Sequence, residues 1–186
     1  AKAAIEADSN KNDNDASPRS APELWNVTFV GSDAEPGLAG KFQQGIHFRR
    51  GTAATINNMI MTHFADSPID IDGEVSAAQA TAGNLTVSNS LFFDNANSTN
   101  WVEETGDDNN DGGFDEDAFF HDAMYNNLFV DPQLEDATNL TAPNFKLKAG
   151  SPALSGATPS AGFDTSADFM GAMGDVDWTE GWTSFK

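Results

Sequence analysis

The chain has 186 residues, with 29 acidic against 9 basic side chains and a formal net charge of −20. This charge repels nucleic acid and anionic lipid, so neither is expected as a partner. The absence of cysteine excludes disulfides, thiolate metal sites and cysteine nucleophiles. No apolar run approaches the roughly 18 residues of a membrane span, so membrane insertion is not expected. Such an acidic composition is typical of proteins in saline water outside cells, and we expect an extracellular or cell-surface location.

Three segments alternate strictly between apolar and polar side chains, which is the pattern of half-buried strands. They are residues 5–8, 46–49 and 69–72. Parallel stacking of these strands places Ile46 beside Ile69 in the core and sorts the outward side chains into two rows. One row holds Glu6, His47 and Asp70, and the next holds Asp8, Arg49 and Asp72.

Four other segments repeat an asparagine that is followed by a short apolar strand. The key asparagines are Asn26, Asn58, Asn89 and Asn127. Further short apolar stretches precede them, so each repeat contains three short strands with an asparagine at a sharp corner. Asparagine tolerates the left-handed backbone of such a corner, and its side chain can hydrogen-bond to the asparagine of the next repeat.

These repeats predict an all-β chain, a right-handed parallel β-helix of about four coils over residues 1–150. The alternative is a generic β-sandwich with asparagines in its turns. The first strand, residues 5–8, has no visible cap in the sequence. Because bare strand edges are rare, we expect it to meet missing N-terminal coils of a longer protein or a second copy of the chain by self-association.

Residues 94–118 interrupt the coils as a long acidic insertion. After it, residues 118–125 have helical spacing, which predicts one short helix docked on the coils. Its N-cap is Asp115 or Asp117, and its apolar face consists of Phe119, Phe120 and Met124. Residues 151–186 are expected to form an irregular capping tail on the coils. Trp178 and Trp182 are expected to pin that tail, although tryptophans can also form sugar-stacking platforms.

Residues 131–134 and 144–154 resemble the segment that ends many bacterial pectate-lyase-like β-helix proteins. Residues 45–52, 168–174 and 178–183 are similar to a group of large secreted or lipid-anchored bacterial β-helix proteins of mostly unassigned function. The resemblance implies that this chain is the C-terminal part of such a protein. It implies the fold and leaves the activity open, because members share a scaffold and no known reaction.

The acidic insertion contains the sharpest local motif, with oxygen ligands at alternate positions and a glycine that turns the loop, as Ca²⁺ requires. The candidate ligands are Asp107, Asn109, Asp111, Gly113 through its carbonyl, Asp115 and Asp117. The pattern departs from an EF-hand because Ala118 stands where the bidentate glutamate belongs, so Glu116 or Asp117 would substitute. The alternative is a solvated acidic loop without metal.

A second candidate is the possible ligand face formed by His47, Arg49, Asp70 and Asp72. The resemblance suggests it, because pectate-lyase-like enzymes work on an exposed sheet face with acidic Ca²⁺ ligands and a basic residue. However, the outward pairs are already matched in sign, so a salt-bridge ladder explains them without catalysis. We therefore favour a non-enzymatic structural or binding module, calcium-binding and self-associating. The alternative is a β-helix that binds or cleaves an extracellular polysaccharide.

Overall fold

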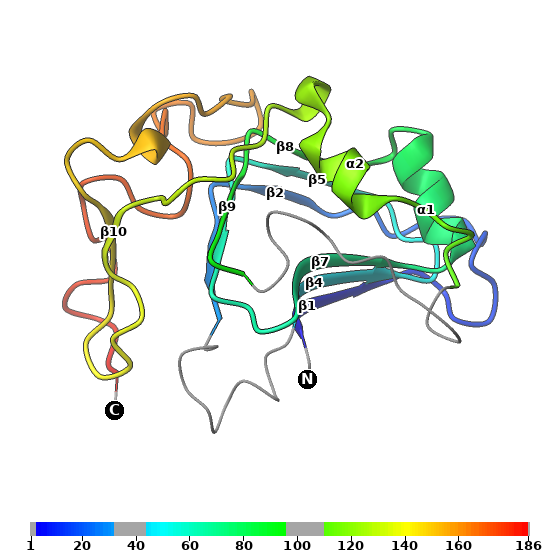
Figure 1. Ribbon diagram of the computed structural model, residues 1–186, viewed down its shortest axis with the longest axis horizontal. Helices are drawn as coiled ribbons and strands as arrows, with labels where there is room; N and C mark the ends of the chain where they lie inside the picture. Colours follow the sequence, from blue (N-terminus) through cyan, green and yellow to red (C-terminus); the bar gives the residue numbers. More distant parts are fainter. Residues whose placement is uncertain (1–2, 32–43, 96–109, 186) are drawn as a thin grey trace.

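The computed structural model describes residues 3–31, 44–95 and 110–185. Three parallel sheets form its main body (Figure 1). Sheet A contains β1 (Ala3–Asp8), β4 (Gln44–Arg49) and β7 (Ser67–Asp72). Sheet B contains β2 (Glu23–Trp25), β5 (Ala54–Asn57) and β8 (Leu85–Ser88). Sheet C contains β3 (Thr28–Val30), β6 (Ile60–Thr62) and β9 (Leu91–Phe93).

The chain visits sheets A, B and C in turn and then returns to sheet A, so each strand lies beside its counterpart from the next round. All pairs within these three sheets are parallel, as in stacked coils of a β-helix. A β-sandwich of antiparallel strands does not fit this pairing. An isolated bridge between Leu91 and Leu128 extends sheet C. The right-handed sense and the number of coils stay predictions.

The register of sheet A is the one that the alternating pattern predicts. Ile46 pairs with Ile5 on one side and with Ile69 on the other. Both predicted outward rows are present, Glu6 with His47 and Asp70, and Asp8 with Arg49 and Asp72. A shift of one residue would turn every apolar side chain of a strand to the outside, so the buried isoleucines hold this register.

The core lies inside the three sheets and is filled by the inward apolar side chains of successive strands. Its fully buried members include Ile46, Phe48, Ile56, Met61, Phe64, Ile69, Ile71, Val87 and Phe92. Removal of this apolar surface from water is the main force that holds the coils together.

Left-handed asparagines form the corner between sheets B and C. Asn26, Asn58 and Asn89 have φ angles of 54°, 57° and 48°, as expected. The fourth corner residue is Asn126, with a φ of 54°, and not the predicted Asn127. The Asn127 side chain does not join the asparagines of the corner. It donates to the carbonyls of Val87 and Phe120 and accepts from the Ser90 N–H.

The corner side chains form a ladder that is interrupted at its centre. Asn58 donates to Asn26 Oδ1 over 3.2 Å, and Asn126 donates to Asn89 Oδ1 over 2.9 Å. Asn89 donates to Asn57 instead of Asn58. Asn58 has other partners in the C-terminal segment, since its Oδ1 accepts from the Thr158 N–H over 2.9 Å and its Nδ2 donates to the Thr158 carbonyl over 3.1 Å.

The predicted helix is present as α2 (Glu116–His121), and the predicted N-cap Asp115 accepts from the Ala118 N–H over 2.8 Å. Phe120 is fully buried, but the assignment of Met124 to the apolar face is wrong, because 75% of its surface is exposed. A 3₁₀ turn, η2 (Ala123–Tyr125), follows α2. In this turn Tyr125 is buried and Met124 is not.

The expectation of a single helix is wrong, because α1 (Glu74–Thr81) follows β7 directly. Its buried residues are Ser76, Ala77 and Ala80, so its contact face is made of small side chains. Such a face lacks the bulky apolar period from which amphipathic helices are recognised. No helix in the described part of the chain is long and apolar enough to span a bilayer.

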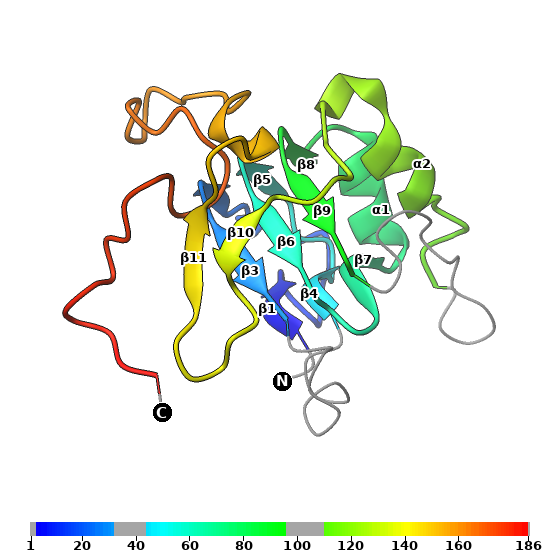
Figure 2. The ribbon, with the colours of Figure 1, turned by 60° about the vertical axis from the view of Figure 1, so that its left-hand side comes forward.

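The C-terminal segment builds a second apolar cluster on the outside of sheet C. It contains an antiparallel hairpin of β10 (Leu134–Asp136) and β11 (Asn144–Leu147), followed by a 3₁₀ turn, η3 (Pro152–Leu154). Figure 2 shows this hairpin alongside sheet C. The buried members of the cluster are Ile60, Leu91, Leu147, Ala153 and Met170. Sheet C is therefore covered on both faces.

Residues near Gly171 attach the C-terminal tail to the coils. The Gly171 N–H donates to the Asn58 carbonyl over 2.7 Å, and the Ala172 N–H donates to Thr28 Oγ1 over 2.9 Å. Gly171 has a φ of +86°, and a Cβ there would lie 2.6 Å from Ile60 Cδ1, so only glycine fits without a shift. The role given to Trp178 and Trp182 is wrong, since they are 54% and 67% exposed and stack on each other.

Candidate ligand surfaces

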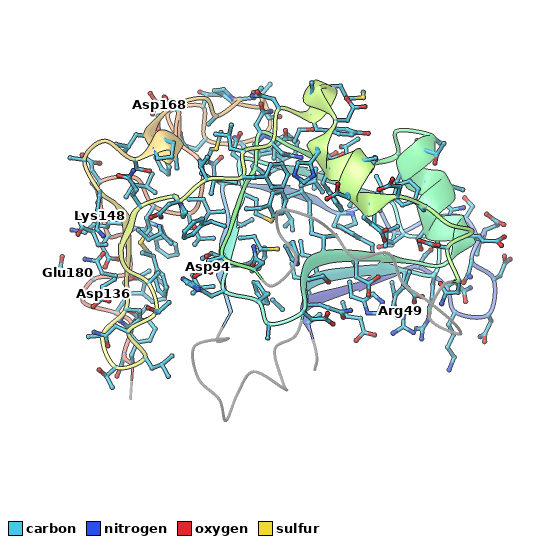
Figure 3. The ribbon with its side chains drawn as sticks, in the orientation of Figure 1. Arg49, Asp94, Asp136, Lys148, Asp168 and Glu180 are labelled. Atoms are coloured by element: carbon cyan, nitrogen blue, oxygen red, sulfur yellow. The ribbon has the colours of Figure 1, made fainter. Side chains whose placement is uncertain are left out.

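The outer face of sheet A is a network of ion pairs centred on Arg49, which Figure 3 labels on that side of the molecule. Arg49 Nη1 donates to Glu6, and Arg49 Nε lies 3.5 Å from both Asp8 Oδ1 and Asp72 Oδ2. The neighbouring Arg50 donates to the second oxygen of Asp8. Acidic side chains of β1 and β7 thus flank the basic side chains of β4, and the sign of charge alternates from strand to strand.

His47 lies between two carboxylates of the same face. Its Nε2 is 3.4 Å from Asp70 Oδ2 and 3.5 Å from Asp72 Oδ2. Burial lowers the pKa of His47, but the hydrogen bond that His47 donates to Asp72 and the charges of both aspartates outweigh it, so the net shift is upward from 6.5. The imidazolium form is therefore favoured between the two carboxylates.

The two aspartates beside His47 have opposite pKa shifts. Burial raises the pKa of Asp70 to about 6, even though Gln44 donates to it over 2.6 Å. The hydrogen bond from His47 lowers the pKa of Asp72, and Asn110 Nδ2 adds a second hydrogen bond over 2.8 Å. Glu6, Asp8, Asp70 and Asp72 thus each lie within 3.5 Å of a basic side chain of this face.

The calcium loop lies partly outside the described residues, which begin again at Asn110, so Asp107 and Asn109 are not placed. Asp111 accepts from the Gly113 N–H over 2.9 Å, while Asp115 caps α2 and Asp117 pairs with His121. In the described ranges, no group of three or more acidic or histidine side chains is placed to hold a metal ion. Loading of this loop with Ca²⁺ therefore stays a prediction.

Glu116, the possible substitute ligand, lies against the edge of sheet A. Its Oε1 accepts from the Ile71 N–H over 3.4 Å, and burial raises its pKa to about 7. The side chain thereby satisfies a backbone group of the last strand of sheet A, and the nearby charge of Asp111 adds to the upward shift of its pKa.

A groove on the outer side of sheet C was not predicted from the sequence. Its larger hollow has a volume of about 630 Å³ and is mainly apolar, and a smaller polar hollow of about 230 Å³ adjoins it. The walls come from β3, β6, the β10 and β11 hairpin and the tail around Trp178. No local motif marks this groove, because the hairpin and the tail form it only when they fold back onto the coils.

Comparison with known families matches residues 1–148 to the pectate-lyase-like β-helix domain. No curated protein and no solved structure matches the chain. The family match covers the three parallel sheets and the corner asparagines, which form the stacked strands, and extends over the antiparallel hairpin. The chain therefore belongs to the family of pectate-lyase-like β-helix domains.

Proposed function

We propose that this domain is a non-enzymatic structural and binding module of the extracellular space or cell surface. The observation that carries the proposal is the closed network around Arg49, whose guanidinium contacts carboxylates from both neighbouring strands. The family fits a surface or polysaccharide-related module, and the charge of −20 fits exposure to saline water.

A polysaccharide lyase would require a different arrangement on this face. Its base must be free to take a proton from the sugar, with a groove that holds the polymer beside it. Here Arg49 is bound to Glu6 and Asp72, and His47 is held between two carboxylates. The groove beside sheet C is not lined by Glu6, His47, Arg49 or Asp72. The geometry of sheet A thus supports a ladder that joins the coils.

The direct test is incubation of the protein with polygalacturonate and with neutral polysaccharides, with and without Ca²⁺, followed by assay of unsaturated products and new reducing ends. We expect no cleavage, and Arg49→Met should remain folded. Cleavage by the native protein that disappears in a stably folded Arg49→Met variant would replace the structural role with a lyase role.

A second candidate function is the binding of an extracellular polysaccharide without cleavage. The specific observation in its favour is the groove on sheet C, where an aromatic hollow adjoins a polar one. Carbohydrate sites combine these features, because aromatic faces contact the apolar faces of sugar rings while polar groups bind the hydroxyls.

We also propose that the acidic insertion binds Ca²⁺ through the loop that includes Asp111 and Gly113. Carboxylates at such density repel one another unless a cation offsets their charge. Chelation with EDTA is expected to accelerate proteolysis within residues 101–118 several-fold, and an excess of Ca²⁺ should restore protection. Equal cleavage rates with EDTA and with Ca²⁺ would count against a calcium loop.

Self-association, or pairing with further coils, completes the proposal. Among the described residues, β1, β2 and β3 each have a strand neighbour on one side only. At the opposite end of the coils, the Asn89 N–H donates to the Tyr125 carbonyl and Leu128 pairs with Leu91. Unpaired strand edges recruit further strands. Light scattering should detect association at high concentration, and a stable monomer would argue against a second copy as the partner.

A further inference from the structure

We propose that the groove on the outer side of sheet C binds an oligosaccharide without carboxylate groups, either neutral or amino-substituted. This inference rests on the polysaccharide-binding candidate above and names its site and ligand class. The site lies mainly on sheet C, with Ala4 of β1 also in its lining, and it does not include the charged residues of sheet A.

The two hollows of the groove lie against the same segment of the hairpin, since Ala137 and Thr138 line both of them. The apolar hollow has aromatic walls from Phe145, Trp178 and Phe185. Phe145 and Phe185 meet edge to face, with ring centroids 6.4 Å apart. An elongated ligand can therefore contact aromatic rings at one end and polar groups at the other.

Trp178 presents an aromatic face whose polar atom is already satisfied. Its indole N–H donates to the Ala172 carbonyl over 2.7 Å, and the ring stacks on Trp182 at a centroid distance of 5.7 Å. The Trp182 indole in turn donates to the Trp178 carbonyl over 2.7 Å. These contacts hold the Trp178 ring in one orientation, while more than half of its surface remains open for the C–H groups of a pyranose.

The polar hollow contains a buried hydroxyl that lacks a partner. Thr62 lines this hollow and is only 1% exposed, and its Oγ1 makes no hydrogen bond to any described residue. A buried polar group without a partner costs about 1 to 3 kcal/mol. A ligand hydroxyl that reached Thr62 would recover part of this cost, which gives the groove a physical reason to bind a polyhydroxylated molecule.

The charge of the hollow selects among saccharides. Asp131, Glu135 and Asp136 line it, and His63 at its wall is paired with Asp94 over 3.2 Å. Figure 3 shows Asp136 on the hairpin and Asp94 at the end of β9. Carboxylates accept hydrogen bonds from sugar hydroxyls and attract ammonium groups, but they repel uronates. The ligand is therefore neutral or cationic and is not a polyuronate.

Isothermal titration calorimetry on the full chain tests the proposal with four probes. They are cellotetraose, the tetramer of glucosamine, tetragalacturonate and a peptide of alternating lysine and leucine. We expect the first or the second to bind, and tetragalacturonate to bind at least tenfold more weakly. Preference for tetragalacturonate, binding of the peptide alone or binding of no probe would overturn the proposal.

Two variants locate the binding in the groove. Trp178→Ala is expected to weaken saccharide affinity at least tenfold. Thr62→Val should weaken it several-fold while the melting temperature stays equal or rises, because valine removes an unpaired hydroxyl at constant volume. Trp25→Ala is the control, since Trp25 stacks on Phe163 outside the groove. Affinity unchanged in both groove variants would overturn the assignment. Polysaccharide cleavage that depends on Arg49 would instead overturn the proposed structural role of sheet A. It would not bear on the proposal that the groove binds a saccharide.

Discussion

Replacing Asn58 with glycine is expected to lower the free energy of unfolding by about 2 to 4 kcal/mol. Asn58 is 0% exposed and occupies a left-handed corner. Its side chain makes three hydrogen bonds, one to Asn26 and two to Thr158, and the substitution removes all three and leaves a cavity where the buried amide stood. Glycine retains the left-handed backbone, so the loss measures the side chain alone.

Asn126→Gly provides the matched control for Asn58→Gly. Asn126 has the same backbone conformation, but it is exposed and donates one side-chain hydrogen bond, to Asn89. Its replacement is expected to cost less than about 1 kcal/mol. Urea unfolding followed by circular dichroism yields both values. Equal losses at the two corners would show that the contacts between Asn58 and the C-terminal segment do not stabilise the coils.

The free energy of unfolding is expected to fall by about 2 to 3 kcal/mol between pH 4 and pH 6.5 because of Asp70. Burial raises the pKa of Asp70 from 3.8 to about 6, so in this range the native carboxyl holds a proton that the unfolded chain has released. Stability therefore decreases as the pH rises. His47, Asp72, Asp66 and Gln44 are the groups that act on this carboxyl.

The histidine and the second aspartate of this face act in different pH ranges. The raised pKa of His47 gives stability that is complete below pH 6.5 and is lost as the pH rises through the native pKa. The lowered pKa of Asp72 gives stability that is lost only as the pH falls below about 4. Stability is thus expected to be highest between about pH 4 and pH 5.

Urea unfolding at pH 4.5 and pH 6.5 tests the role of Asp70. Asp70→Asn is expected to remove about half of the decrease, because asparagine has no proton to lose while the buried Glu116, whose pKa is raised to about 7, still contributes. Asp175→Asn removes the same charge from an exposed position and should leave the decrease in place. A decrease of the same size in Asp70→Asn would assign it to general repulsion among the carboxylates.

The register of sheet A could be predicted because the alternating segments 46–49 and 69–72 leave one way to bury Ile46 and Ile69. The left-handed corners at Asn26, Asn58 and Asn89 could be predicted because few residues tolerate that backbone. At the last corner, two adjacent asparagines were indistinguishable by pattern. Their roles depend on contacts with Ser90 and Phe120, which the local sequence does not encode.

The groove and the path of the tail could not be predicted, because both depend on contacts between distant segments. Thr158 and Gly171 contact Asn58 although they lie 100 and 113 residues further along the chain. Trp178 and Trp182 were expected to pin the tail onto the coils, but their indole groups donate to nearby carbonyls of the tail and their rings stay exposed. The sequence also could not decide whether the outer face of sheet A binds a ligand or joins the coils. His47, Arg49, Asp70 and Asp72 suit both roles, and only their geometry distinguishes them.

A double-mutant cycle between Arg49 and Asp72 tests most directly whether the outer face of sheet A is a structural ladder. Urea unfolding of Arg49→Met, Asp72→Asn and the double variant yields the coupling energy between the two side chains. The account predicts a favourable coupling of about 0.5 to 1 kcal/mol, as for a partly exposed pair within a network. The combination of Arg50→Met with Asp72→Asn should show none, because Arg50 pairs with Asp8. A coupling of zero between Arg49 and Asp72 would contradict the ladder.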